Sequence, residues 1–232
     1  MRIHKYISLT GYCSRREVKR LLENGRITVN GVVCNKDTEV DEGDTVLIDH
    51  KPIPRKKISI YLAFNKPVGI TCTANPEIKG NILECVNVSE RVFPVGRLDK
   101  ASQGLILLTN DGELANRISQ SDFRHEKEYE VTLNQPVTEL FLQKMAEGVP
   151  VLNTITRPAK IKFVSKYVFR ITLTQGLNRQ IRRMCKALGY EVEKLERIRI
   201  MNIHLHTLAA GKWRELKPDE LLVLKEGLDL LK

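Results

Sequence analysis

The first fifty residues carry apolar positions first at helical spacing and then at strand spacing. Ile3, Tyr6 and Ile7 recur as they would on one face of a helix. Ser14 and Glu17 form a capping box, which predicts that a second helix begins there. In ITVNGVVCN an Asn-Gly pair separates two β-branched runs, which is a strong hairpin signal, and TVLID is typical of a further strand. This pattern predicts a compact unit of two helices and a small sheet.

Strand patterns dominate the chain after a segment rich in proline and lysine, KPIPRKK. The runs SIYLAF, GLILLT, KEYEVTL, AKIKFV and YVFRITLT predict strands, and helical patterns lie around residues 112–121, 138–147 and 178–188. Mixed strands with interspersed helices favour an α+β fold, with a mainly antiparallel sheet and flanking helices. We predict three parts, which are a small helix/sheet module, a stiff solvated linker and the larger domain, at residues 1–50, 51–58 and 59–232.

Charge and composition narrow the class of protein. Lys and Arg number 38 against 28 Asp and Glu, and a net charge of +10 suggests a polyanionic partner such as nucleic acid. The 42% of apolar residues argue against disorder. No apolar run approaches the roughly 18 residues needed to cross a bilayer, and the N-terminus lacks the apolar stretch of a secretory signal. We therefore expect a cytoplasmic protein whose five cysteines are reduced.

The second predicted helix is strongly basic. Arg15 and Lys19 lie four residues apart, as do Arg16 and Arg20, and such like-charge pairs repel each other. A surface that faces RNA phosphates would explain this cost, although an incidental basic helix stays an alternative. The capped basic helix together with GRITVNG resembles the small RNA-binding module named after ribosomal protein S-four. That resemblance implies RNA binding and no chemistry of the module's own.

The segment VFPVGRLDKASQGLILLTNDG holds the first candidate for chemistry. Asp99 lies in a loop before an apolar strand, and Arg97 can face the same side if the loop is extended. A cationic neighbour keeps a carboxylate ionised, as a nucleophile requires. For an isolated Arg-Leu-Asp sequence, a turn closed by an aspartate–backbone hydrogen bond would be the simpler explanation.

The longer signature around Asp99 favours a catalytic carboxylate over a simple turn. GRLDKASQGLILLTNDG is similar to the signature of the pseudouridine synthases that act on ribosomal RNA, in the RsuA-like branch, and the resemblance implies that Asp99 is catalytic. Many members have threonine where this chain has Ser102. The family also uses a tyrosine from a K-x-Y strand, which HEKEYEVTL supplies as Tyr129. The Tyr129 ring can stack on an extruded uracil, and its hydroxyl can act as a base. Without the signature it would be an ordinary strand tyrosine.

A third element is the helix predicted in TQGLNRQIRRMCKALGYEV, with Asn178 as its cap. Its apolar stripe consists of Ile181, Met184, Cys185 and Leu188. Basic residues project roughly opposite, towards solvent or RNA phosphate: Arg179, Arg183 and Lys186. Arg182 sits about 100° from Ile181, at the edge of the stripe, so it can point inward. The resemblance assigns Arg182 as the ion-pair partner of Asp99.

Motifs spread over nearly the whole chain indicate one type of synthase within this family. FNKPVGI, HEKEY and FRITLTQGLNRQIRRMCKALGYEVEKLERIRIMN look like the F-type synthases of large-subunit (23S) ribosomal RNA. The resemblance implies that the enzyme isomerises one uridine of a 23S-type stem-loop without cofactor or metal, and transfer RNA is open as a second substrate. The sequence agrees, because it lacks a G-x-G-x-x-G motif and the His204–His206 pair has no nearby third ligand. We expect a monomer.

Two alternatives remain at this point. A non-catalytic RNA-binding or ribosome-assembly factor would keep the basic module but would have no use for Asp99, Tyr129 and Arg182 together. A hydrolase that uses Asp99 and Asp111 would need both carboxylates in register, and Asp111 is better explained by the turn in NDG. Two chemical routes also stay open, which are attack of Asp99 on the anomeric carbon and removal of a ribose proton to give a glycal.

Overall fold

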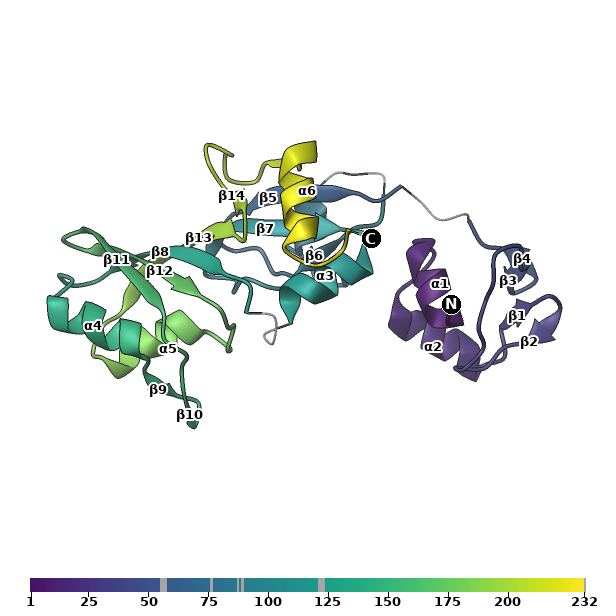
Figure 1. Ribbon diagram of the computed structural model, residues 1–232, viewed down its shortest axis with the longest axis horizontal. Coiled ribbons are helices and arrows are strands. Elements are labelled where there is room, and N and C mark those ends of the chain that lie inside the picture. Colours follow the sequence, from purple (N-terminus) through teal and green to yellow (C-terminus); the bar gives the residue numbers. More distant parts are fainter. Residues whose placement is uncertain (55–57, 76, 87, 89, 121–123, 232) are drawn as a thin grey trace. The chain divides into compact units, whose positions relative to one another are not determined.

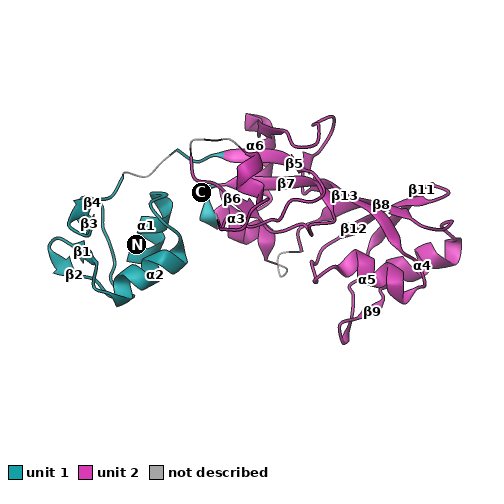
Figure 2. Ribbon diagram, turned by 180° about the vertical axis from the view of Figure 1, so that it is seen from behind, with its two compact units in different colours: residues 1–60, 110–112 teal, residues 61–109, 113–232 magenta. Residues whose placement is uncertain are grey.

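The structure is a computed structural model that describes residues 1–54, 58–75, 77–86, 88, 90–120 and 124–231. The chain forms two compact units (Figures 1 and 2). Unit 1 comprises residues 1–60 with 110–112, and unit 2 comprises residues 61–109 with 113–232. The α+β prediction is confirmed, because helices and mainly antiparallel strands alternate along the chain.

The described part of unit 1 consists of two helices and a four-stranded sheet in the order β2-β1-β3-β4. The Ser14 side chain accepts a hydrogen bond from the Glu17 amide at 3.2 Å, so the predicted helix start is confirmed. Asn30 and Gly31 have φ of 51° and 83°, as a two-residue hairpin turn requires. The elements are α1 (Ile3–Leu9), α2 (Arg15–Glu23), β1 (Ile27–Val29), β2 (Val32–Val33), β3 (Val46–Ile48) and β4 (Lys51–Pro52).

The sheet of unit 1 reaches into the segment that we predicted as linker. Asp49 and His50 have φ of 51° and 64°, so the chain reverses there and β4 pairs antiparallel with β3. The first two residues of the segment are therefore strand, because a tight turn after β3 folds them back. Residues 55–57 of the expected linker lie outside the described residues, and the three-part division stays a prediction.

Within the described residues, unit 2 is built on one nine-stranded sheet in the order β11-β12-β8-β13-β7-β5-β15, with β14 beside β13 and β6 beside β7. The central pair β13–β7 is parallel, and the other pairs are antiparallel. The strands are β5 (Tyr61–Lys66), β6 (Phe93–Val95), β7 (Gln103–Thr109), β8 (Lys127–Leu133), β11 (Lys160–Ser165), β12 (Val168–Leu173), β13 (Val192–Ile200), β14 (Ile203–His204) and β15 (Trp213–Glu215). A separate hairpin joins β9 (Pro150–Val151) and β10 (Thr154–Ile155).

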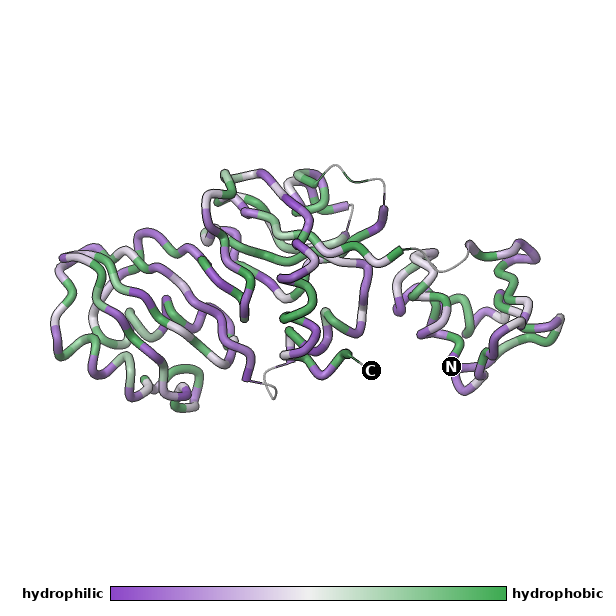
Figure 3. Tube along the Cα trace, turned by 45° about the horizontal axis from the view of Figure 1, so that its top comes forward, coloured by the Kyte–Doolittle hydropathy of each residue, from purple (hydrophilic) through white to green (hydrophobic). Residues whose placement is uncertain are grey.

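Two hydrophobic cores, formed by described residues, lie along this sheet. One packs α4 (Glu139–Glu147) and α5 (Gln180–Ala187) on β8, β12 and β13. The other packs α3 (Gly112–Ser119) and α6 (Pro218–Glu226) on β5 and β7. Strand β13 contributes Leu195 to the first core and Ile200 to the second, so the residues between them lie where the cores meet. Figure 3 shows hydrophobic and hydrophilic stretches alternating along the trace.

The close approach of β7 to β13 depends on Gly104. A Cβ at this position would lie 2.6 Å from the Arg197 backbone nitrogen and closer still to the Arg197 carbonyl oxygen, and the glycine has φ of 104°. Only glycine combines this backbone conformation with this separation.

We expect Gly104→Ala to destabilise unit 2 by about 2–5 kcal/mol, since overpacking and a positive φ both oppose the methyl group. Urea unfolding followed by fluorescence of Trp213, the only tryptophan, measures this loss. Gly211→Ala is the matched control, because Gly211 has φ of 77° and no atom within 4 Å of the added Cβ. Equal losses in the two variants would show that the contact with Arg197 does not matter.

Candidate active site

The Asp99 loop is fixed by contacts on both sides. Strand β6 ends at Val95, and Gly96 with φ of 71° turns the chain. Leu98 is buried, and its amide donates to the Cys72 sulfur at 3.3 Å. The Ser102 amide donates to the Asp99 carbonyl at 3.0 Å, which closes a turn before β7. Asp99 itself is half-buried, so its neighbours position it while its side chain stays accessible.

Three of the predicted catalytic residues lie around the same space. Arg97, Asp99 and Tyr129 line both a cavity of about 110 Å³ and an adjoining one of about 510 Å³. Tyr129 comes from β8 and lies opposite Ile171 of β12 and Arg197 of β13. Together the two cavities fall in the size range of small-molecule sites, and they could admit a nucleotide that has left its stack.

Arg182, the fourth predicted catalytic residue, binds backbone instead of carboxylate. Its guanidinium donates to the Val192 carbonyl at 2.9 Å and to the Ala101 carbonyl at 3.0 Å. Burial lowers the pKa of Arg182, the charge of Arg179 lowers it further, and the Asp99 carboxylate opposes both. Among the described residues no ion pair within 4.0 Å joins Arg182 to Asp99. Arg182 therefore holds the loop two residues beyond Asp99.

The N-terminus of α5 differs from the prediction. The helix is preceded by Arg179 with φ of 51°, and Asn178 does not cap it. The buried Gln180 side chain accepts the Leu177 amide at 3.0 Å, and this turn moves the helix start to Gln180. Asn178 instead binds Arg183 through its backbone carbonyl, at 2.9 Å. Arg179, expected on the outward face, consequently lines both cavities.

The remaining predicted RNA contacts are all exposed. Arg183 and Lys186 lie on the outer side of α5, and the four basic residues of α2 lie at the surface of unit 1: Arg15, Arg16, Lys19 and Arg20. Two of the α2 side chains form exposed ion pairs on the same helix, Lys19 with Glu23 at 3.7 Å and Arg20 with Glu17 at 3.8 Å. Such pairs are weak, so these side chains remain available to phosphates.

Two basic residues at the larger cavity were not predicted. Arg197 is 2% exposed, and its Nε donates to the Leu105 carbonyl at 2.6 Å. Its guanidinium carbon lies 6.0 Å from the centroid of the Tyr129 ring. Lys127 also lines the larger cavity, and burial together with Arg197 lowers the Lys127 pKa to about 8. The period of a strand could have revealed Lys127, which is two residues before Tyr129, whereas no sequence signal marks Arg197 as buried.

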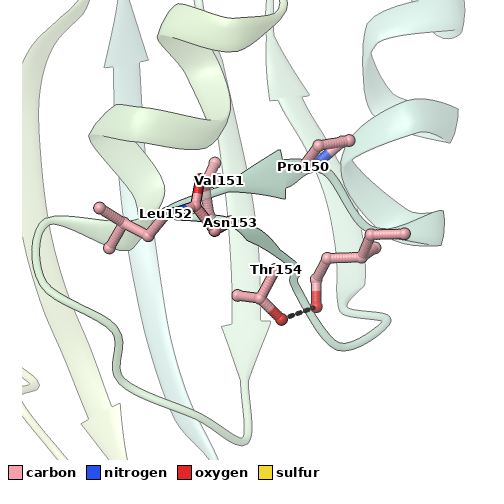
Figure 4. Close-up of a pocket in the computed structure, with 6 residues that line it drawn as sticks. Pro150, Val151, Leu152, Asn153 and Thr154 are labelled. Atoms are coloured by element: carbon pink, nitrogen blue, oxygen red, sulfur yellow. Dashed lines mark hydrogen bonds between the residues drawn. The ribbon is translucent and has the colours of Figure 1, made fainter.

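A hollow around the β9–β10 hairpin is lined by uncharged residues only, from Pro150 to Ile155 (Figure 4). In the described part of the chain no group of three or more His, Cys, Asp or Glu side chains could hold a metal ion. No helix among the described residues is long and apolar enough to span a membrane.

Known protein families and individual relatives match nearly the whole chain. Residues 60–187 match the RNA pseudouridylate synthase family, and residues 1–46 match the S4 domain. The dual-specificity RNA pseudouridine synthase RluF of Escherichia coli (strain K12) is 51% identical over 97% of this chain and 78% of its own. Ribosomal large subunit pseudouridine synthase B of Bacillus subtilis (strain 168) is 32% identical over 98% of this chain and 97% of its own.

A solved structure extends the similarity to three dimensions. The crystal structure of a pseudouridylate synthase superposes with a TM-score of 0.72 at 27% identity, over 97% of this chain and 99% of that one. These matches confirm the family that the sequence motifs indicated, its fold and the RNA-binding module at the N-terminus. The chain belongs to the RNA pseudouridine synthases and carries an S4 domain at its N-terminus.

Proposed function

We propose that this synthase isomerises one uridine in a stem-loop of large-subunit (23S) ribosomal RNA, with Asp99 as the catalytic carboxylate. The observation that carries the proposal is the grouping of Asp99, Arg97 and Tyr129 around one pair of cavities at the junction of the two cores. The name of the Bacillus subtilis relative supports ribosomal RNA as the substrate.

The arrangement fits each step of the isomerisation. The target uridine leaves its stack, and stacking on Tyr129 returns about 1–3 kcal/mol of that cost. The Asp99 carboxylate then attacks the anomeric carbon or takes a ribose proton, and the bond from that carbon to N1 breaks. The uracil turns and C5 bonds to the anomeric carbon. In the first route the bond between Asp99 and that carbon breaks as the new bond forms, and in the second route Asp99 returns its proton to the ribose. The C5 proton passes to a base and N1 gains a proton. The Tyr129 hydroxyl is our candidate for the base.

We extend the proposal to a second RNA and to the cellular setting. The Escherichia coli relative is named a dual-specificity RNA pseudouridine synthase, which supports a second RNA substrate, and we propose transfer RNA for that role. We also propose that the enzyme acts as a monomer in the cytoplasm.

Mapping of pseudouridine in cells with and without the protein tests this function. We expect one position in large-subunit ribosomal RNA to lose pseudouridine when the protein is absent, and to regain it when the purified protein is added to the RNA. The same maps include transfer RNA. An unchanged map of ribosomal RNA would overturn the substrate assignment, and release of free uracil would favour a hydrolase.

The basic helix of unit 1 leads to a prediction about salt. Replacing Arg15, Arg16, Lys19 and Arg20 by Gln should weaken RNA binding and make the slope of log affinity against log salt shallower by about 0.7–0.9 for each phosphate contact that is lost. The single-turnover rate at saturating RNA should change little. Lys36→Gln, at another exposed position of unit 1, is the control. An unchanged slope would mean that α2 does not contact the RNA backbone.

A further inference from the structure

The larger cavity has an excess of positive charge. Its charged lining residues in the described part of the chain are one carboxylate, Asp99, and four cations: Arg97, Lys127, Arg179 and Arg197. Asp99 balances only one of these cations. Arg97 and Arg179 are exposed, whereas Lys127 is half-buried and Arg197 is buried. The two less accessible cations repel each other, and a bound anion relieves that repulsion.

Lys127 is held there by weak contacts. Its ammonium group donates to the Ile118 carbonyl at 3.4 Å and to the His125 carbonyl at 3.3 Å, and both distances are long for such bonds. Among the described residues it forms no ion pair within 4.0 Å. Burial and the neighbouring Arg197 both disfavour its charged form, and its pKa falls to about 8. An anion in the cavity would stabilise the ammonium group.

Arg197 supplies a second unused donor. Its Nε is bonded to Leu105, but its Nη2 is buried with no hydrogen-bond partner among the described residues. The side chain is 2% exposed and contacts the Tyr129 ring from the neighbouring strand. A buried donor without a partner is costly, so its retention beside Tyr129 suggests that an acceptor binds there.

We propose that Lys127 and Arg197 form a phosphate subsite, which binds a phosphodiester group adjoining the target uridine and so places that nucleotide against Asp99 and Tyr129. The inference rests on the proposed function, because the anion belongs to the substrate RNA. A phosphodiester fits better than a uracil carbonyl, since only the phosphate carries the negative charge that offsets the excess of cations. Lysine is a common phosphate ligand as a point charge.

Neutral phosphate analogues test this subsite directly. The probes are the mapped stem-loop RNA and two versions of it, each with one methylphosphonate linkage, either 5′ or 3′ of the target uridine. Lys127→Met should weaken binding of the natural RNA about tenfold, as expected for one charge-assisted hydrogen bond. For one of the methylphosphonate RNAs, wild type and Lys127→Met should bind alike. Lys144→Met, an exposed lysine on α4, is the control and should bind all three RNAs like wild type.

The pH dependence of binding gives a second readout. The pKa of Lys127 is about 8 in the free protein, and a bound phosphate raises it. Affinity for the natural RNA should therefore be constant below pH 8 and fall as the pH rises to 9, whereas Lys127→Arg should bind with a flat profile. The Lys127→Arg comparison isolates Lys127, because the other charged or titratable groups at the cavity and beside His125 are the same in both proteins: Arg97, Asp99, Arg117, His125, Tyr129, Arg179 and Arg197.

Different results would refute the phosphate subsite and the proposed pseudouridine synthesis. If wild type makes pseudouridine but Lys127→Met loses the same factor on all three RNAs, Lys127 acts through the fold and the subsite is refuted. Arg197→Gln repeats the comparison for the second donor, with Trp213 fluorescence as the check that unit 2 is folded. If wild type makes no pseudouridine in the stem-loop, the proposed substrate fails, and the methylphosphonate comparison still decides whether Lys127 contacts phosphate.

Discussion

Asp99→Asn should lower the rate of pseudouridine formation by about 10⁴-fold or more, as loss of a catalytic nucleophile does in other enzymes. Asparagine keeps the shape of the side chain but can neither attack the anomeric carbon nor accept a ribose proton. The loop should stay in place, because its position depends on the Leu98 and Ser102 amides rather than on the carboxylate. RNA affinity should therefore be nearly unchanged.

Single-turnover measurement at saturating RNA checks this expectation, with RNA binding measured on the same preparation. Asp111→Asn is the comparison, since a hydrolase that used both carboxylates would be impaired by either change. Appreciable turnover by purified Asp99→Asn would remove Asp99 from the chemistry. Loss of RNA binding together with turnover would place it in substrate binding instead.

The strands with regular alternation could be predicted from sequence, and the charged central strand could not. KEYEVTL corresponds residue for residue to β8 (Lys127–Leu133). In contrast, VEKLERIRI was not predicted as β13, because its charges are typical of a surface segment. Arg199 is paired with Glu126 at 3.0 Å and with Glu128 at 2.8 Å on the adjacent segment. That pairing is invisible until the two strands are side by side.

At the candidate site, too, some residues could be predicted from the sequence and others could not. A local signature marks Asp99 and a K-x-Y strand marks Tyr129, so both could be assigned to one candidate site before the fold was known, and both line the same cavities. Arg197 could not, because an arginine in an alternating strand is ordinarily exposed and only the packing of two cores on β13 buries it. The left-handed conformation of Arg179 could not be predicted from the sequence either, because it depends on the turn that the buried Gln180 side chain closes.

Arg182 should matter to the reaction more than its neighbour Arg183. Its two hydrogen bonds tie the Ala101 carbonyl, next to the Asp99 turn, to the Val192 carbonyl at the start of β13. Arg182→Ala would leave the Ala101 carbonyl without this donor and would release the loop that carries Asp99. A misplacement of about 1 Å costs a reaction about 10²-fold in rate, so we expect a loss of at least that size.

Arg182→Lys and Arg183→Ala complete the comparison. A lysine should restore little, because one ammonium group does not reproduce a planar fork that reaches two carbonyls. Arg183→Ala should mainly weaken RNA binding, since Arg183 is exposed and its bonds go to Asn178. Single-turnover rates at saturating RNA, with the urea midpoint of Trp213 fluorescence as a check on folding, distinguish the two roles. Loss of the chemical step in Arg183→Ala but not in Arg182→Ala would exchange the two roles, which are positioning of the Asp99 loop and RNA binding. The hydrogen bond from Arg182 to Ala101 would then have no effect on the position of Asp99.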